Sequence, residues 1–197
     1  MAGRALASTL RCSAPIRTTS WRSHATWVAG AATATPALHG ARAWNCRPAW
    51  QLQLAYTWLD ATFRDGFPIC TSSGCTTPGV QVAAGTRIPG VARQQASVRL
   101  GWQGEQWSAA AQVLGVGSVT VNDTGSERAP GHGLLNLELA RDWPAGSGRL
   151  QGFARIDNAL DRFHIGSVIV NEGNGRFYEP GAGRTFTVGL RWHWTDR

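Results

Sequence analysis

Apolar and polar residues alternate one by one along six segments of the chain, and this alternation limits the folds available to it. Successive side chains of a β-strand point to opposite faces, so a period of two predicts strands with one apolar face and one polar face. The pattern is clearest near the end, where Phe186, Val188 and Leu190 alternate with Thr and Gly. The predicted strands are Trp50–Thr62, Arg93–Trp102, Trp107–Val121, Leu134–Trp143, Leu150–Ala159 and Thr185–Trp194.

The composition favours an all-β fold and excludes several other classes. The 197 residues include 24 glycines and 10 tryptophans, while charged residues make up only 16%. Coiled coils and long-helix bundles need abundant Glu, Lys and Leu, and this sequence contains no Lys. It also lacks a run of about 18 apolar residues, so it offers no membrane-spanning helix.

The lengths of the connections distinguish between two kinds of alternating sheet. Such a sheet either buries its apolar face in a soluble protein or turns that face toward lipid in a membrane barrel. Four residues separate Trp102 from Trp107 and six separate Trp143 from Leu150, whereas the other connections have about 30, 12 and 25 residues. Outer-membrane barrels alternate short periplasmic turns with long external loops in this way. A soluble or secreted β-sheet binding protein is the alternative interpretation.

Six of the ten tryptophans stand at strand ends on the side of the short connections. We predict that they form an aromatic belt at one membrane interface, where indole is favoured because it combines an apolar body with an N–H donor. The predicted belt consists of Trp50, Trp102, Trp107, Trp143, Trp192 and Trp194. Strands of about 10 residues also span the ~25 Å apolar band of such barrels. The predicted fold is therefore an all-β, antiparallel, up-and-down transmembrane β-barrel fragment of about six strands.

Several segments resemble one known family. They are LAYTWLDATF (54–63), GTRIPGVAR (85–93), FARIDNALDR (153–162) and NGRFYEPGAGRTFTVGL (174–190). On these segments, residues 48–194 resemble the C-terminal end of a TonB-dependent outer-membrane receptor barrel. The resemblance implies a barrel of about 22 strands in the outer membrane of a Gram-negative bacterium. It also implies active uptake of a scarce nutrient, most often a ferric siderophore, and neither enzymatic activity nor a cofactor.

The resemblance also implies partners that this sequence does not itself supply. A receptor of this family binds an extracellular small-molecule ligand, sits in outer-membrane lipid and has a plug domain through which the TonB system acts. Here six predicted strands stand without a plug, and Thr195, Asp196 and Arg197 follow the final Trp194. Open strand edges in lipid are costly and known barrels have at least about eight strands. We therefore expect that the chain does not transport a ligand without the remainder of the barrel.

Residues 1–47 differ from the rest of the chain. They contain six arginines and no acidic residue, and they show no regular hydrophobic period. We expect this segment to be disordered, and we interpret it as an out-of-frame or misassigned start rather than a targeting segment. Residues 48–197 then form the barrel portion. Because that portion has 13 arginines against 12 acidic residues, it is nearly neutral and no nucleic-acid partner is expected.

The remaining polar and cysteine residues suggest structural roles. Cys70 and Cys75 lie in a loop rich in Gly, Thr, Pro and Ser, and without a second ligand pair they predict a disulfide rather than a zinc site. Asp157, Asn158 and Asp161 predict a strand-end turn rather than a cation site. We expect no metal site and no catalytic residue, because the five histidines share no ligand spacing and no nucleophile–base grouping appears.

Charged residues within the predicted strands divide between the two faces. We expect lumen ion pairs among the inward-facing residues Arg99, Arg155, Arg191, Glu138 and Asp157. Arg141 falls instead on the apolar face of its strand, near the strand end, where a long side chain can reach the interface. His132 and His164 fall in the predicted outer loops.

Overall fold

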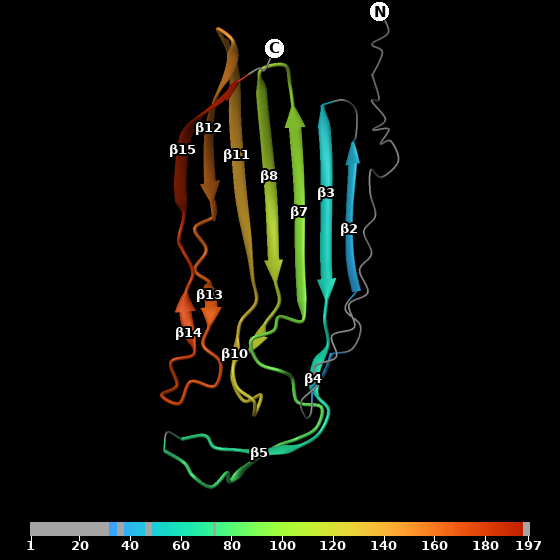
Figure 1. Ribbon diagram of the computed structural model, residues 1–197, viewed down its shortest axis with the longest axis vertical. Helices are drawn as coiled ribbons and strands as arrows, with labels where there is room; N and C mark the ends of the chain where they lie inside the picture. Colours follow the sequence, from blue (N-terminus) through green and yellow to red (C-terminus); the bar gives the residue numbers. More distant parts are fainter. Residues whose placement is uncertain (1–31, 35–37, 46–48, 73, 195–197) are drawn as a thin grey trace, which may run out of the picture.

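The main sheet is a single layer of seven antiparallel strands in the order β15-β12-β11-β8-β7-β3-β2 (Figure 1). The computed structural model describes residues 32–34, 38–45, 49–72 and 74–194. The strands of the sheet are β2 (Leu38–Asn45), β3 (Trp50–Trp58), β7 (Gln94–Gln103), β8 (Trp107–Val116), β11 (His132–Ala145), β12 (Gly148–Asp157) and β15 (Thr185–Trp194). Each strand pairs with the next one along the chain within this sheet, which is the up-and-down arrangement.

All six predicted strands are present, so the all-β, antiparallel prediction is confirmed. The last predicted strand, Thr185–Trp194, has the same bounds in the structure. Two predicted strands are shorter than expected, because the chain leaves the main sheet and continues as a separate short strand. The first continues as β4 (Ala61–Phe63) and the third as β9 (Val119–Thr120).

A seventh strand, β2, lies within the segment 1–47 that was expected to be disordered, and it limits that expectation at Leu38–Asn45. Its backbone pairs with β3, with Leu38 opposite Trp58 and Asn45 opposite Gln51. The sequence LHGARAWN does not predict this strand, because a glycine and an arginine interrupt the apolar alternation. Backbone pairing with the edge of β3 does not require that alternation. The short strand β1 (Ala32–Ala34) likewise pairs with β4, while residues 1–31, 35–37 and 46–48 lie outside the described residues.

Short turns and long loops lie at opposite ends of the sheet (Figure 1). The β11–β12 turn is tighter than the six residues expected, since both strands extend and leave only Gly146 and Ser147 between them. Gly146 has φ +53°, a conformation that glycine adopts without steric cost. Three residues join β7 to β8 at the same end.

The long loops carry three small hairpins, and the buried core of the described residues lies among these loops. The hairpins are β5 (Phe67–Ile69) with β6 (Val80–Val82), β9 with β10 (Arg128–Ala129), and β13 (Ile165–Val168) with β14 (Tyr178–Pro180). The buried hydrophobic residues are Val82, Val121 and Ala129, and all three belong to this loop region. The sheet itself therefore does not enclose a core.

The apolar face of the sheet has no second layer over it within the described residues. Its side chains form continuous rows across the strands, because the register sets Leu100 opposite Ala111, and Ala111 opposite Leu137. Many of these side chains are exposed, for example Leu139 at 47% and Val188 at 80%. Among the described residues no helix is long and apolar enough to cross a membrane.

The strand-end turn predicted at Asp157–Asp161 is present, and Asn158 holds it together. Asn158 is buried and has φ +49°, which Asn tolerates better than most residues. Its backbone N–H donates to Asn136 Oδ1 at 3.0 Å, and its side-chain Nδ2 donates to the carbonyl of Arg162 at 2.9 Å. The Arg162 N–H donates back to Asn158 Oδ1 at 2.9 Å. One side chain thus replaces the ladder contacts that β12 loses where it ends.

Candidate functional site

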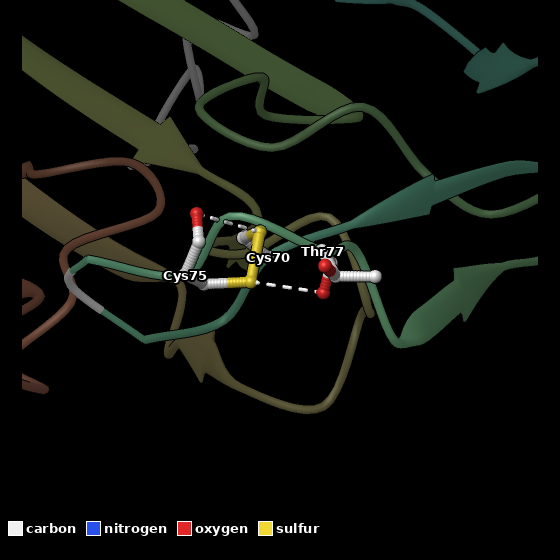
Figure 2. The surroundings of a disulfide bond; sticks show 3 residues. All are labelled: Cys70, Cys75 and Thr77. Atoms are coloured by element: carbon white, nitrogen blue, oxygen red, sulfur yellow. Dashed lines mark hydrogen bonds between the residues drawn. A yellow bond between two sulfur atoms is a disulfide. The ribbon is translucent and has the colours of Figure 1, made fainter.

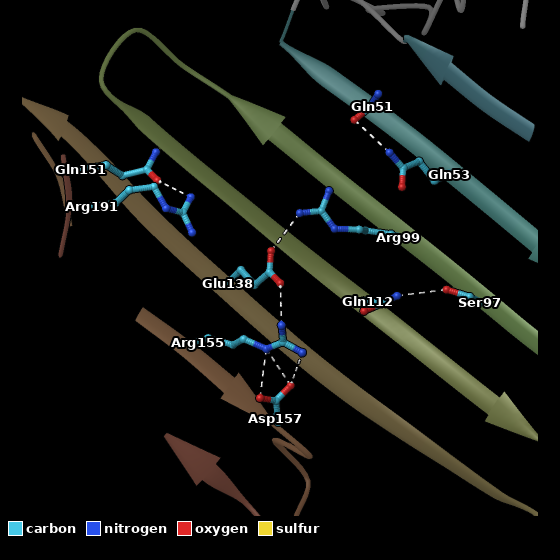
Figure 3. Close-up of polar contacts among 10 residues, drawn as sticks. All are labelled: Gln51, Gln53, Ser97, Arg99, Gln112, Glu138, Gln151, Arg155, Asp157 and Arg191. Atoms are coloured by element: carbon cyan, nitrogen blue, oxygen red, sulfur yellow. Dashed lines mark hydrogen bonds and ion pairs between the residues drawn. The ribbon is translucent and has the colours of Figure 1, made fainter. Parts of the chain in front are cut away.

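The polar face of the sheet carries a chain of ion pairs centred on Glu138 (Figure 3). Arg99 Nη2 donates to Glu138 Oε2 at 2.8 Å, and Arg155 Nη1 lies 3.6 Å from Glu138 Oε1. Arg155 also holds Asp157, with its Nε donating to Asp157 Oδ1 at 2.8 Å. The ion pairs predicted for these four residues are confirmed. They come from three strands, β7, β11 and β12, and tie the strands together on one face.

Small neighbours allow Arg99 to reach an acid two strands away. In the register Glu138 stands opposite Ala110 of β8, and Ala110 stands opposite Gly101 of β7. A Cβ atom added at Gly101 would lie 3.5 Å from Arg99 Nη1, so the guanidinium lies across this gap. Because the Arg99 and Glu138 side chains remain about one third exposed, we assign the pair at most about 1 kcal/mol of stability.

The ion-pair prediction was wrong for Arg191, because no described residue provides an acidic partner for its side chain. Its Nη1 donates to Gln151 Oε1 at 3.2 Å, and its guanidinium lies 5.5 Å from the ring centre of Phe153. Gln151 in turn donates to Asp142 Oδ1 at 3.0 Å. Gln151 therefore lies between Arg191 and Asp142 and bonds to both side chains. The sequence pattern did not indicate this arrangement.

A hollow of about 580 Å³ follows this polar face and is lined by Arg99, Glu138, Gln151, Arg155 and Arg191. Its walls thus present hydrogen-bond donors and acceptors of both charges. Such a surface suits water or a polar protein segment rather than an apolar ligand.

The six tryptophans of the predicted aromatic belt lie toward the short-turn end of the sheet. Trp50 and Trp102 face each other across the β3–β7 pair, and Leu150 stands between Trp143 and Trp192. Trp107 is opposite Arg141, while Trp194 is opposite Gly148. Five of the six indoles are more than one third exposed. The register shifts the cluster along the strands, since the row that holds Trp50 and Trp102 reaches β15 at Val188, six residues before Trp194. That this cluster forms a belt at a lipid interface stays a prediction.

A second cavity, of about 840 Å³, opens at the other end, where three long loops meet. Its lining includes Ile69, Asp123, Asn171, Glu172 and Phe177. Asn171 Nδ2 donates to Asp123 Oδ2 at 2.8 Å, and the Asp123 N–H donates to Asn171 Oδ1 at 2.9 Å, which joins two of the loops. The sequence pattern does not indicate this cavity, because its lining residues lie too far apart in the chain to give a spacing signal.

Other polar groups at the long-loop end of the sheet are also brought together. His132 is the first residue of β11 and not part of a loop as expected, and its ring lies 4.7 Å from that of His164. The Tyr178 hydroxyl donates to Glu127 Oε2 at 3.3 Å. Burial raises the pKa of Tyr178, and the negative charge of Glu127 adds to the shift. No cluster of three or more potential metal ligands occurs within the described residues.

The cysteine loop is closed by a bond between Cys70 and Cys75, whose Cα atoms are 5.7 Å apart (Figure 2). The Cys75 Sγ lies 3.2 Å from the Thr77 carbonyl oxygen, which is a sulfur–oxygen contact because a bridged sulfur carries no proton. The bond closes the tip of the β5–β6 hairpin, which lines the loop cavity.

Thiol labelling of the exported chain tests this bond. In a chain whose Cys12 and Cys46 are replaced by serine, we expect Cys70 and Cys75 to resist a maleimide reagent until the protein is reduced, since export places them in an oxidising compartment. A Cys70→Ser variant is the control, because it leaves Cys75 as a free thiol that labels without reduction. Labelling of both cysteines in the unreduced chain would show that the disulfide does not form.

Comparison with known proteins gives a family and a fold. Residues 27–159 match the family described as TonB dependent receptor-like, beta-barrel. The siderophore receptor PiuA from Acinetobacter baumannii is similar in structure, with a TM-score of 0.67 and 14% identity over 82% of this chain and 22% of PiuA. BauA, the ferric preacinetobactin receptor from the same organism, gives 0.65 and 14% over 89% of this chain and 25% of BauA. The ferric-catecholate import receptor Fiu from E. coli K12 gives 0.55 and 17% over 81% of this chain and 20% of Fiu.

Two features of these matches concern the predicted domain boundary and the share of a receptor that this chain represents. The family match begins at residue 27, upstream of the boundary expected at residue 48, and so includes β2. This chain spans about a quarter or less of the length of the receptors it resembles.

Proposed function

Because the chain belongs to the TonB-dependent receptor-like β-barrel family, we propose that it forms part of the wall of an outer-membrane receptor barrel. In this proposal the barrel takes up a scarce nutrient, a ferric siderophore, with energy delivered by the TonB system through a plug domain. The siderophore receptors PiuA and BauA, whose folds this chain shares in part, support this ligand class.

One observation carries the proposal: the sheet is a single layer with two chemically different faces. The apolar face stays uncovered within the described residues, and the opposite face holds the Glu138 ion pairs. In a soluble protein an apolar face of this size would be buried by another layer. A barrel wall needs both faces as they are, one toward lipid and one toward a polar lumen.

The long loops indicate which end of the proposed barrel wall faces the cell exterior. Long loops of such barrels face outward, so the cavity of Asp123, Asn171 and Phe177 would open to the cell exterior. We propose that it belongs to the surface that meets the extracellular ligand.

The two open edges of the sheet support the proposal that the barrel needs strands from outside this chain. Neither β2 nor β15 has a partner on its outer side within the described residues. Each unpaired backbone group in lipid costs several kcal/mol, so the sheet needs strands from the remainder of the barrel. The chain alone is therefore not transport-competent in this proposal.

Fractionation of cells tests the location and the need for further strands. Residues 38–194, which include β2, are joined to a BauA that lacks its matching quarter, and this chimera is compared with the truncated BauA alone. We expect the chimera in the outer membrane, with the heat-modifiable migration of a closed barrel, because its edges are paired. The truncated BauA should be degraded, and the full chain exported without BauA should support no uptake from a panel of ferric siderophores.

The alternative, a soluble or secreted β-sheet binding protein, gives a different result in the same experiment. The full chain, exported behind a working signal, would then be recovered only in the soluble periplasmic fraction. That recovery would contradict the proposed function.

A further inference from the structure

Among the strands β3, β7, β8, β11, β12 and β15, Arg141 is the one charged residue on the apolar face of the sheet; in β2 the register also sets Arg42 opposite Leu54 of that face. It stands in β11 opposite Trp107 of β8 and Gly152 of β12, on the face of Leu139 and Trp143. A cation in this place needs either a counter-charge or a route to water. The surroundings of Arg141 therefore indicate what it binds.

Two indole rings hold the guanidinium of Arg141. Its Cζ atom lies 5.0 Å from the ring centre of Trp107 and 5.3 Å from that of Trp143. The Trp143 ring lies over Gly152, where an added Cβ atom would come within 2.8 Å of it. Glycine at that position is therefore needed for the ring to pack on β12. These contacts hold the guanidinium beside two aromatic rings, which stabilise its charge without using its hydrogen-bond donors.

The described residues supply no hydrogen-bond acceptor to the Arg141 side chain. Its Nε is buried and has no hydrogen-bond partner within the described residues. The neighbouring acid Asp142 points to the other face, where it pairs with Arg149 at 3.6 Å and accepts from Gln151. An unpaired buried donor of a charged group is costly, so an acceptor from outside the chain is favoured.

We propose that Arg141, Trp107 and Trp143 form a binding site for the phosphodiester headgroup of a membrane phospholipid. The inference rests on the proposed function, because it needs the apolar face to meet lipid. A phosphodiester offers two anionic oxygens that match the fork of a guanidinium. The occupant is a lipid rather than free phosphate, because the cradle opens on an apolar face that acyl chains can cover, with Leu139 in the next outward-facing position of the strand. The lipid belongs to the leaflet on the short-turn side.

Native mass spectrometry of the full chain in detergent micelles tests the site. The chain is titrated with dioleoyl-phosphatidylglycerol, with dioleoylglycerol, which has the same acyl chains without the phosphate, and with inorganic phosphate. We expect retention of phosphatidylglycerol to exceed that of dioleoylglycerol by about tenfold, as for a charge-assisted contact. Inorganic phosphate should not compete at equal concentration.

Variants identify the residue responsible. Arg141→Gln should reduce the retention of phosphatidylglycerol about tenfold, and Arg141→Lys about threefold, because it keeps the charge and loses the fork. Arg149→Gln, which removes the same charge at the same end of the sheet but on the polar face, should retain the lipid as the unchanged chain does. Circular dichroism of each variant reports its strand content, and the lysine variant serves if the glutamine variant does not fold.

The outcomes separate this inference from the proposed function. Equal retention of phosphatidylglycerol by the unchanged chain and both Arg141 variants would overturn the headgroup site, as would equal retention of dioleoylglycerol. Displacement by inorganic phosphate would show an anion site without a lipid. The measurement in micelles does not depend on uptake, whereas recovery of the chain in the soluble periplasm alone would overturn the proposed function.

Discussion

An arginine at position 111 should prevent stable insertion of the sheet in a bilayer, whereas an arginine at position 110 should be tolerated. Ala111 lies midway along β8 on the apolar face, between Leu100 and Leu137. An arginine on the lipid face near the bilayer midplane costs about 2–4 kcal/mol. Ala110 lies at almost the same depth on the polar face, opposite Glu138, where an added arginine competes with Arg99 for that acid, so the cost is limited to an ion pair worth at most about 1 kcal/mol.

Unfolding of the two variants in lipid vesicles measures this difference. We expect Ala111→Arg to lower the free energy of unfolding by about 2–4 kcal/mol, and Ala110→Arg to change it by less than about 1 kcal/mol. The two variants carry the same substitution at adjacent residues, so strand propensity and net charge cancel in the comparison. Equal effects, or a larger loss for Ala110→Arg, would contradict a lipid-facing apolar surface.

Replacing Asn158 by alanine should be the most damaging change outside the membrane-facing surface. The residue is only 3% exposed, and its side chain links the end of β12 to Arg162 and to Ala182 in the segment that leads into β15. Its loss leaves the Arg162 N–H and two carbonyls without their partner, and each such group costs about 1–3 kcal/mol when buried. We expect a total loss of about 2–4 kcal/mol in the free energy of unfolding, measured by chemical denaturation in detergent micelles.

Asn171→Ala is the matched control for this prediction. Asn171 also has a positive φ, +56°, and also bonds through both side-chain atoms, but it lies exposed in an external loop. The backbone strain of alanine is therefore common to both variants, and the difference reports the buried hydrogen bonds. We expect Asn171→Ala to cost about 1 kcal/mol or less. Similar losses in both variants would show that Asn158 acts only through its backbone conformation.

Within residues 153–162, which resemble the family motif, two residues make contacts that their residue types did not predict. Asp157 and Asn158 were predicted as turn formers from their residue types. In the structure Asp157 belongs to the ion pairs of the polar face, while Asn158 closes the corner with a buried hydrogen-bond network. Adjacent residues of one motif thus serve the two sides of the strand end.

The predictions were wrong at positions where pairing between strands, and not the pattern of one strand, determines the structure. The strand Leu38–Asn45 was missed because Gly40 and Arg42 break its pattern, yet the open edge of β3 supplies backbone partners regardless of side chains. Arg191 was expected to contact an acid, but register places Gln151 directly opposite it. Neither outcome can be derived from one strand considered alone.

What the amino-acid sequence determined by itself is which side chains share a face of each strand, and hence that the sheet has one apolar and one polar surface. This is local information, because the side-chain period of a strand depends only on its own backbone. The tertiary structure alone decided which residues meet: Glu138 with Arg99 from two strands away, and Arg141 between Trp107 and Trp143. Those contacts depend on register and on where the loops return the chain, and a one-residue slip in register would change every one of them.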